Sequence, residues 1–146
     1  MREILFRGKL LFTGEWVYGS YLPDTDTLDE NTAYILTYEL NDPDYVYEKV
    51  DLDTVGQYTG LKDKNGERIW EGDIVKWDDQ SNGIYWRFAV VRIDPDIQFD
   101  CSPIDCINGM FNSSRYNFRY ACFAYKDTDN YLSVIGNIHD NADLIK

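Results

Sequence analysis

The sequence predicts a mostly β fold made of about eight short strands. Aromatic residues are 16% of the 146 residues, and such side chains suit a pleated, half-buried surface. Short runs of aromatic and β-branched residues alternate with turn dipeptides at roughly 8–12-residue intervals, which is typical of a small barrel or a multi-sheet β protein. The hydrophobic fraction of 44% is enough for a core.

The stretch Gln57–Lys76 carries the strongest strand and turn signals and organises the prediction. Its Asn65-Gly66 pair is the strongest short-range hairpin signal, because both residues tolerate the positive φ that a tight turn needs. The predicted order is strand Gln57–Leu61, turn Lys62–Gly66, strand Glu67–Trp70, turn Glu71-Gly72-Asp73 and strand Ile74–Trp77.

The first third of the chain contains further strand candidates. They are Glu3–Phe6, then Lys9–Phe12 and Trp16–Tyr21 around a turn at Gly14, and later Thr32–Glu39 and Tyr45–Val50. The segment Pro23–Asn31 is rich in Asp and Thr and is expected to be a loop. A helix over Asp29–Leu40 stays open as an alternative, since short apolar runs separate helix from strand poorly.

The last third predicts longer strands and a terminal helix. Ile84–Ile93 alternates apolar residues as a strand does, and Asp94–Phe111 is expected to be loop because Pro95 and Pro103 interrupt it. Arg115–Tyr125 and Leu132–Ile138 are the remaining strand candidates, and Asp140 is expected to cap a short helix that runs to Ile145.

The net charge of −12 is concentrated in one part of the chain. Residues 1–21 have a net charge of +1, residues 22–54 hold ten acids and the single base Lys49 for a net of −9, and residues 55–146 have −4. Binding to a nucleic-acid backbone needs clustered Lys and Arg, so ordinary DNA or RNA binding is disfavoured.

The sequence predicts a cytoplasmic protein with no membrane partner. It contains no apolar run long enough to span a bilayer, and its start, MREILFRGK, lacks the apolar centre of a signal peptide. The three cysteines are therefore expected to stay reduced.

Three blocks of the chain resemble the YopX family of temperate-phage and prophage proteins. The first is Arg2-Glu3-Ile4 with Phe6-Arg7, and the last is Val134-Ile135-Gly136-Asn137-Ile138 with Asn141 and Leu144. The central block is Gln57-Tyr58-Thr59-Gly60-Leu61-Lys62-Asp63-Lys64-Asn65-Gly66, followed by Ile69 and Glu71-Gly72-Asp73-Ile74-Val75. The chain has Gly8-Lys9-Leu10 where the family usually has a Trp-Asp pair, and the segments 22–54 and 94–115 align with nothing.

The resemblance implies a multi-sheet YopX-like fold, with an N-terminal β subdomain at 1–54 and an SH3-like small barrel at 55–146. It also implies a homo-oligomer and a phage or prophage origin. It implies no activity, so this chain's own specificity is expected in the two segments that align with nothing.

No catalytic residue is predicted. The only histidine is His139, and any Ser-His-Asp or Cys-His arrangement would have to use it. Cys122 alternates with aromatics as a core residue does, and Cys101 has no activating neighbour in the sequence.

No metal or other cofactor is predicted either, although a zinc site stays open. Three thiols and one imidazole, from Cys101, Cys106, Cys122 and His139, form a known structural ligand set, but they lack a tight CxxC knuckle. Two groups of acids, Asp24 with Asp26 and Asp29, and Asp51 with Asp53, do not continue into a calcium loop. No phosphate-binding glycine motif is present.

Four aromatic residues crowd the predicted C-terminal strands: Tyr58, Trp70, Trp77 and Trp86. They are expected to fill the interior of the small barrel, since a small β domain needs bulky side chains there. A binding groove is the alternative, because exposed aromatics often contact partners.

Two functional hypotheses follow. The first is a non-enzymatic phage accessory protein that self-assembles and binds a host or phage protein, motivated by the resemblance and by strand edges that need cover. The second is an acidic mimic of nucleic acid that inhibits a host DNA-binding protein or nuclease, motivated by the charge of residues 22–54. A solvated acidic face is the simpler explanation of that charge.

Overall fold

The computed structural model describes residues 3–25, 31–37, 44–78, 86–101, 116–119 and 128–145. Within them the fold is mostly β, with two antiparallel sheets and only short helices. The strands are β1 Phe6–Leu10, β2 Trp16–Pro23, β3 Thr32–Thr37, β4 Val46–Lys62, β5 Arg68–Trp70, β6 Asp73–Asp78, β7 Trp86–Ile93, β8 Ile97–Cys101, β9 Tyr116–Arg119 and β10 Ser133–Asn137. The helices are α1 Thr128–Tyr131 and a 3₁₀ turn, Ala142–Ile145.

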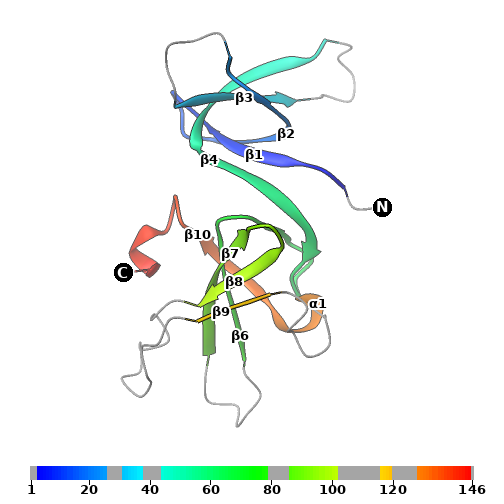
Figure 1. Cartoon of the computed structure of the whole chain (residues 1–146), viewed down its shortest axis with the longest axis vertical. Coiled ribbons are helices and arrows are strands. Elements are labelled where there is room, and N and C mark those ends of the chain that lie inside the picture. The colour runs from blue at the N-terminus through cyan, green and yellow to red at the C-terminus, as the bar shows by residue number, and fades with distance from the viewer. Residues whose placement is uncertain are drawn as a thin grey trace. The chain divides into compact units, whose positions relative to one another are not determined.

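The chain divides into two compact units, Met1–Tyr58 (unit 1) and Thr59–Lys146 (unit 2). The division lies inside β4, whose first part pairs with β3 and β1 and whose last part leads into the hairpin with β5 (Figure 1). The boundary expected at 54/55 lies in the same strand.

The strands of unit 1 form a sheet in which every described strand has two neighbours. β1 pairs with β2, β2 with β3, and β3 with β4, while β1 also pairs with β4. One face of these strands buries a small core, Ala33, Ile35 and Val50, against which Phe6, Leu10, Val17, Tyr21, Leu52 and Val55 pack. The opposite face of these strands points away from the core.

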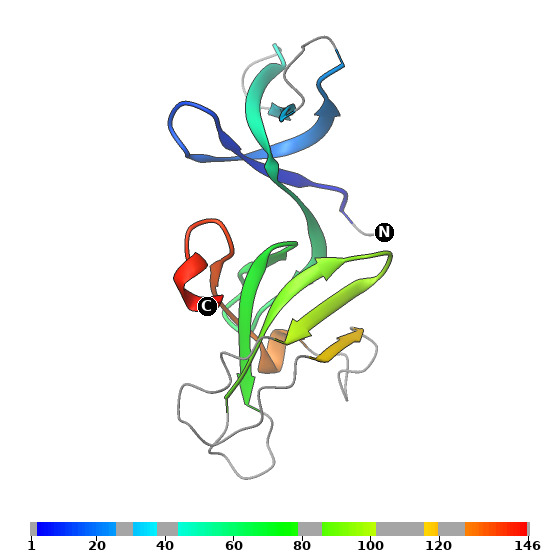
Figure 2. The same cartoon turned by 60° about the vertical axis from the view of Figure 1, so that its left-hand side comes forward.

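Unit 2 contains a five-stranded antiparallel sheet in the order β10-β6-β7-β8-β9. Figure 2 shows the β7–β8 hairpin of this sheet in yellow-green. The core is larger than that of unit 1, and its buried members are Ile69, Val75, Trp77, Ala89, Val91, Phe99, Cys101 and Leu132. Trp77 and Phe99 meet edge to face with ring centroids 6.5 Å apart, a favourable aromatic geometry.

The hairpin predicted at Asn65-Gly66 is confirmed. The N–H of Gly66 donates to the carbonyl of Asp63 (3.0 Å), and the N–H of Asp63 donates to the carbonyl of Glu67 (2.8 Å). Gly66 has a φ of 81°, in the left-handed region that side chains resist. The turn predicted at Gly14 is confirmed in the same way, with a φ of 72°.

We expect the substitution Gly66→Val to lower the free energy of unfolding by about 1 kcal/mol or more. The φ of 81° is the cause, because a β-carbon at Gly66 would meet no heavy atom within 4 Å. Urea unfolding of the two proteins measures the difference. Asn65→Ser in the same turn leaves Gly66 in place and is the control; equal losses in both variants would contradict the explanation.

Several strand predictions need correction. Glu3–Phe6 and Lys9–Phe12 are not two strands: β1 runs from Phe6 to Leu10. The helical alternative over Asp29–Leu40 is wrong in its described part, which is strand β3. Tyr45–Val50 and Gln57–Leu61 belong to one strand, β4, because side chains satisfy its polar centre: Thr54 Oγ1 accepts the N–H of Lys9 and donates to the carbonyl of Asp51.

The loop predicted over Asp94–Phe111 is also wrong in its described part, since Ile97–Cys101 is strand β8. Pro95 lies in the turn between β7 and β8, where the N–H of Asp94 donates to the carbonyl of Asp96, so the proline shapes a hairpin rather than ending the sheet. Of the strand predicted over Arg115–Tyr125, only β9 lies within the described residues.

A short C-terminal helix forms after a turn that Asn137 stabilises. The side-chain carbonyl of Asn137 accepts the N–H groups of His139 (3.0 Å) and Asp140 (2.9 Å). The Asn137 amide donates a hydrogen bond to the Asp140 carboxylate, and the helix that follows is a single 3₁₀ turn. None of the helices within the described ranges is long and apolar enough to cross a membrane.

Candidate functional site

Polar side chains of the Gln57–Lys76 stretch form hydrogen bonds with main-chain groups around them. Asp63 is 1% exposed, and its carboxylate accepts three main-chain N–H groups. Oδ1 accepts those of Asn65 (2.8 Å) and Glu67 (2.9 Å), while Oδ2 accepts that of Val134 in β10 (2.9 Å). One side chain therefore fixes the β4–β5 turn and ties it to a strand that is distant in sequence.

Two further buried side chains act similarly. The hydroxyl of Thr59 donates to the carbonyl of Ile69 (2.7 Å) and accepts the N–H of Leu61 (3.1 Å), which spans Gly60 at its positive φ of 83°. The carboxylate of Asp73 accepts the N–H of Trp70 (2.8 Å) across the turn at Gly72. These hydrogen bonds make the stretch a structural organiser of unit 2.

The four candidate zinc ligands are not shown together. Cys101 is buried in β8 within the hydrophobic core, so its predicted loop position is wrong and it packs as a small apolar residue. His139 lies in the turn after β10, and Cys106 and Cys122 lie outside the described residues. Over the described ranges, no group of three His, Cys, Asp or Glu side chains is placed to hold a metal ion.

The candidate calcium acids have other roles where they are described. Asp51 Oδ1 accepts the N–H of Asp53 (3.0 Å) inside β4, where the pairing of this strand with β1 shifts register. Asp26 and Asp29 lie outside the described residues.

The predicted aromatic cluster is buried where it is described. Tyr58, Trp70 and Trp77 are all buried, as the core interpretation predicts, and the groove alternative is wrong for them. The side chain of Trp86 lies outside the described set. Among the residues that the structure describes, the exposed aromatic side chains lie in unit 1.

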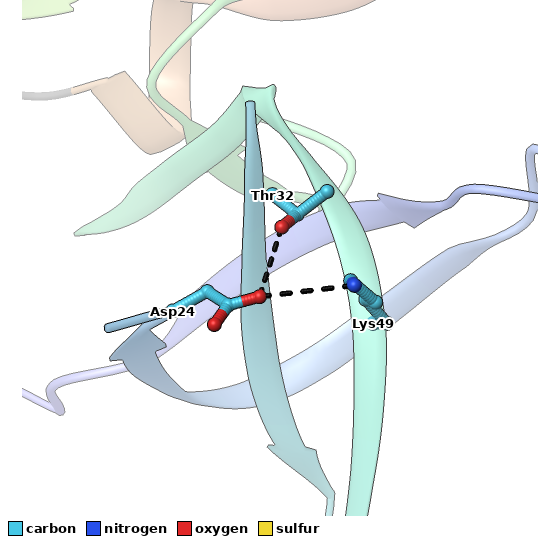
Figure 3. A network of polar contacts seen from close by, with 3 residues as sticks. All are labelled: Asp24, Thr32 and Lys49. Atoms are coloured by element: carbon cyan, nitrogen blue, oxygen red, sulfur yellow. Dashed lines mark hydrogen bonds and ion pairs between the residues drawn. The ribbon is translucent and has the colours of Figure 1, made fainter. Parts of the chain in front are cut away.

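The acidic segment 22–54 contributes β3 and the first part of β4, in agreement with the strands predicted at Thr32–Glu39 and Tyr45–Val50. Figure 3 shows how its single base is held. Asp24 Oδ2 lies 3.8 Å from Lys49 Nζ and accepts a hydrogen bond from the Thr32 hydroxyl (2.9 Å). The Asp24 side chain is only 2% exposed, so this carboxylate and this ammonium neutralise each other.

The exposed face of β2, β3 and β4 carries a set of aromatic and aliphatic side chains. Leu22 pairs with Tyr34 and Leu36 pairs with Tyr47, and paired residues of antiparallel strands point to the same side. Tyr18 alternates with Ser20 and Leu22 along β2, so it shares that side. We call Tyr18, Leu22, Tyr34, Leu36 and Tyr47 the aromatic face; Tyr47 is 60% exposed and Tyr18 is 47% exposed.

Beside the aromatic face, on the same side of the sheet, two cationic side chains lie over an aromatic ring. The Arg7 guanidinium lies 4.5 Å from the centroid of a Trp16 ring, and Lys9 Nζ lies 5.3 Å from one. Arg7 pairs with Tyr18 and Lys9 with Trp16 between β1 and β2. Such cation–π contacts stabilise a positive charge over a ring.

Sequence analysis missed the aromatic face. The alternation of Tyr18 with Leu22 was available as a signal, and so was that of Tyr34 with Leu36. Alternation shows that residues share a side of one strand, but only the strand pairing shows that three strands contribute to one surface.

Comparison with known proteins places the chain in a family. The family model described as YopX protein matches residues 5–146. The chain belongs to the YopX family. Among solved structures, it is similar to the crystal structure of protein EF1440 from Enterococcus faecalis, with 18% identity, a TM-score of 0.51 and coverage of 100% of both chains. A search of curated proteins found no match.

The likeness to the Enterococcus protein shows a shared fold alone, because the identity is low. It extends over both units of this YopX protein, including β3 and β8, which lie in the two segments that the three resembling blocks leave unaligned. The family match likewise spans the segments 22–54 and 94–115. Those segments are therefore parts of the family fold within the described residues.

Proposed function

We propose that this YopX protein is a non-enzymatic accessory protein of a temperate phage or prophage, acting in the host cytoplasm by self-assembly and by binding another protein. One observation carries the proposal. Large apolar side chains that are exposed, among the described residues, all lie in unit 1: Ile4, Leu11, Phe12, Tyr18, Leu22, Tyr45, Val46 and Tyr47. Concentrated apolar exposure is typical of interaction surfaces.

In unit 1, exposed side chains rather than open strand edges favour self-assembly. In unit 1, β1 pairs with both β2 and β4, so the described strands offer no pair of open edges there. Apolar side chains on the surface supply a different driving force, since their burial between copies removes them from water.

We also propose that unit 2 is an SH3-like small barrel. The β6–β9 meander with β10 beside β6 supports this, as does the β4–β5 hairpin tied to β10 through Asp63. In this proposal the Gln57–Lys76 stretch has the role of a folding element, and its buried carboxylates are engaged by main-chain N–H groups.

Light scattering on the purified chain tests the assembly. We expect a mass above that of the 17.1 kDa monomer at micromolar concentration. The double substitution Leu11→Ser and Phe12→Ser removes two exposed apolar side chains from the β1–β2 turn and is expected to shift the mass toward the monomer. A strict monomer over the whole concentration range would contradict the self-assembly half of the proposal.

Acidic mimicry of nucleic acid is the second candidate, and the net charge of −9 on residues 22–54 favours it. The engagement of Asp24 with Lys49 removes one carboxylate from such a track, and the aromatic face interrupts it. A mimic would capture a basic, nucleic-acid-binding host protein that added DNA displaces. Capture that DNA does not displace would exclude mimicry and leave protein binding standing.

A further inference from the structure

The tip of the β4–β5 hairpin is an Asn-Gly pair, Asn65-Gly66, the one such pair within the described residues. Asparagine before glycine is prone to spontaneous deamidation, because glycine has no side chain to obstruct attack by its own main-chain nitrogen. Both residues are exposed, and a β-carbon at Gly66 would meet no heavy atom within 4 Å. Water therefore reaches the pair, and no neighbouring group crowds it at Gly66.

The folded hairpin holds the nitrogen that would attack. The N–H of Gly66 donates to the carbonyl of Asp63 (3.0 Å), so the proton that this nitrogen must lose is engaged in a hydrogen bond. The N–H groups on either side, those of Asn65 (2.8 Å) and Glu67 (2.9 Å), both donate to Asp63 Oδ1. One residue thus fixes three successive main-chain N–H groups, and the attacking nitrogen is released only when the hairpin opens.

We propose that Asn65 is a deamidation site that the closed β4–β5 hairpin protects and the open hairpin exposes. On opening, the main-chain nitrogen of Gly66 attacks the side-chain carbonyl carbon of Asn65. A succinimide ring forms, and the amide group leaves as ammonia with the proton from that nitrogen. Water then opens the ring at either carbonyl and gives aspartate or isoaspartate at position 65. This modification is independent of the assembly and the partner binding proposed above.

The isoaspartate product does not fit the closed hairpin. It places one additional carbon atom in the main chain between position 65 and Gly66, whereas the N–H groups of position 65 and Glu67 converge on a single oxygen, Asp63 Oδ1. The other oxygen, Oδ2, accepts the N–H of Val134 in β10, so a displaced carboxylate also loosens that strand. A brief opening of the hairpin thereby becomes a permanent weakening of unit 2.

The test follows the full chain in mildly alkaline buffer, folded and in urea, by mass spectrometry of the Lys-C peptide Asn65–Lys76. We expect isoaspartate to form at position 65 in urea, and about ten-fold more slowly or less in the folded chain. Asp63→Asn, kept where tryptophan fluorescence shows it folded, should raise the folded rate roughly three-fold or more, because its hold on the turn is weaker. Asn137 is the control within the chain: the branched side chain of Ile138 obstructs attack, so Asn137 should stay unmodified.

The variant Asn65→Asp separates the new charge from the new main-chain atom. It should unfold at nearly the urea concentration of the wild type, whereas the isoaspartate form, isolated from the urea incubation and refolded, should unfold at a lower one. Equal rates in the folded and unfolded chains, or no conversion at Asn65 in urea, would overturn the inference. An unchanged rate in Asp63→Asn, or an isoaspartate form as stable as Asn65→Asp, would do the same.

Discussion

Replacing Asp63 by alanine is expected to lower the free energy of unfolding by about 3 kcal/mol or more. The carboxylate is buried and accepts the N–H groups of Asn65, Glu67 and Val134. Alanine would remove the acceptor of three partly buried main-chain hydrogen bonds, and each loss costs about 1–3 kcal/mol. The change would also separate the β4–β5 turn from β10, because Oδ2 is one of the links between them.

Denaturation followed by the fluorescence of the buried Trp70 and Trp77 measures this effect in unit 2. Asp63→Asn is a graded comparison: it keeps one acceptor oxygen but presents an amide NH₂ to a donor, so its stability should lie between wild type and Asp63→Ala. Glu67→Ala, an exposed change in the same turn, should stay within about 0.5 kcal/mol of wild type. If Asp63→Ala were as mild as Glu67→Ala, the buried carboxylate would not organise the hairpin.

The turn chemistry of this stretch was predictable because it is local. Gly14, Gly66 and Gly72 have positive φ values at three turns that the sequence indicated, and Asn65-Gly66 closes a hairpin. The role of Asp63 was not predictable, since its third partner, Val134, lies far along the chain. A sequence pattern can indicate a turn, but it cannot identify the distant strand that shares the same carboxylate.

The full length of β4 and the position of β8 were not predicted, because they too depend on contacts with strands that are distant in sequence. The acidic residues Asp51 and Asp53 appeared to separate two strands, yet Thr54 and Asp51 supply hydrogen bonds that keep β4 continuous. Pro95 appeared to end regular structure, yet it lies in the turn that joins β7 to β8. In each case tertiary pairing outweighs the local propensity of a few residues.

Residue type alone was a poor guide to candidate sites, because it does not show which side chains are buried. Cys101 looked available for a metal because its segment looked like a loop, and the pairing of β8 with β7 places it in the core. The sequence predicts strands that contain Tyr18 and Tyr47 but not their shared surface; the pairing of β2, β3 and β4 places both side chains on one exposed face. Strand pairing therefore decides which residues are accessible to a partner.

Gly19 marks the point where β2 exchanges one neighbour for another. It pairs with Phe6 of β1, whereas the next residue, Ser20, pairs with Leu36 of β3. A β-carbon at Gly19 would lie 1.9 Å from the main-chain carbonyl oxygen of Leu36, a contact that no side-chain rotation can relieve. The absence of a side chain lets β3 approach β2 closely enough for the strands of unit 1 to pair as they do.

The substitution Gly19→Ala is therefore expected to destabilise unit 1 by about 3 kcal/mol, the upper end of the usual cost of overpacking. Hydrogen exchange measures it: amides of β1, β2 and β3 should exchange much faster, with those of β7 and β8 as an internal reference. Ser20→Ala, the exposed neighbour, should change little.

Gly14→Ala distinguishes the cost of backbone strain from the cost of a steric clash. Gly14 has a positive φ of 72° but no heavy atom within 4 Å of its β-carbon position, so the substitution should cost only about 1 kcal/mol. A Gly19→Ala variant no less stable than Gly14→Ala would show that β2 and β3 can separate without loss.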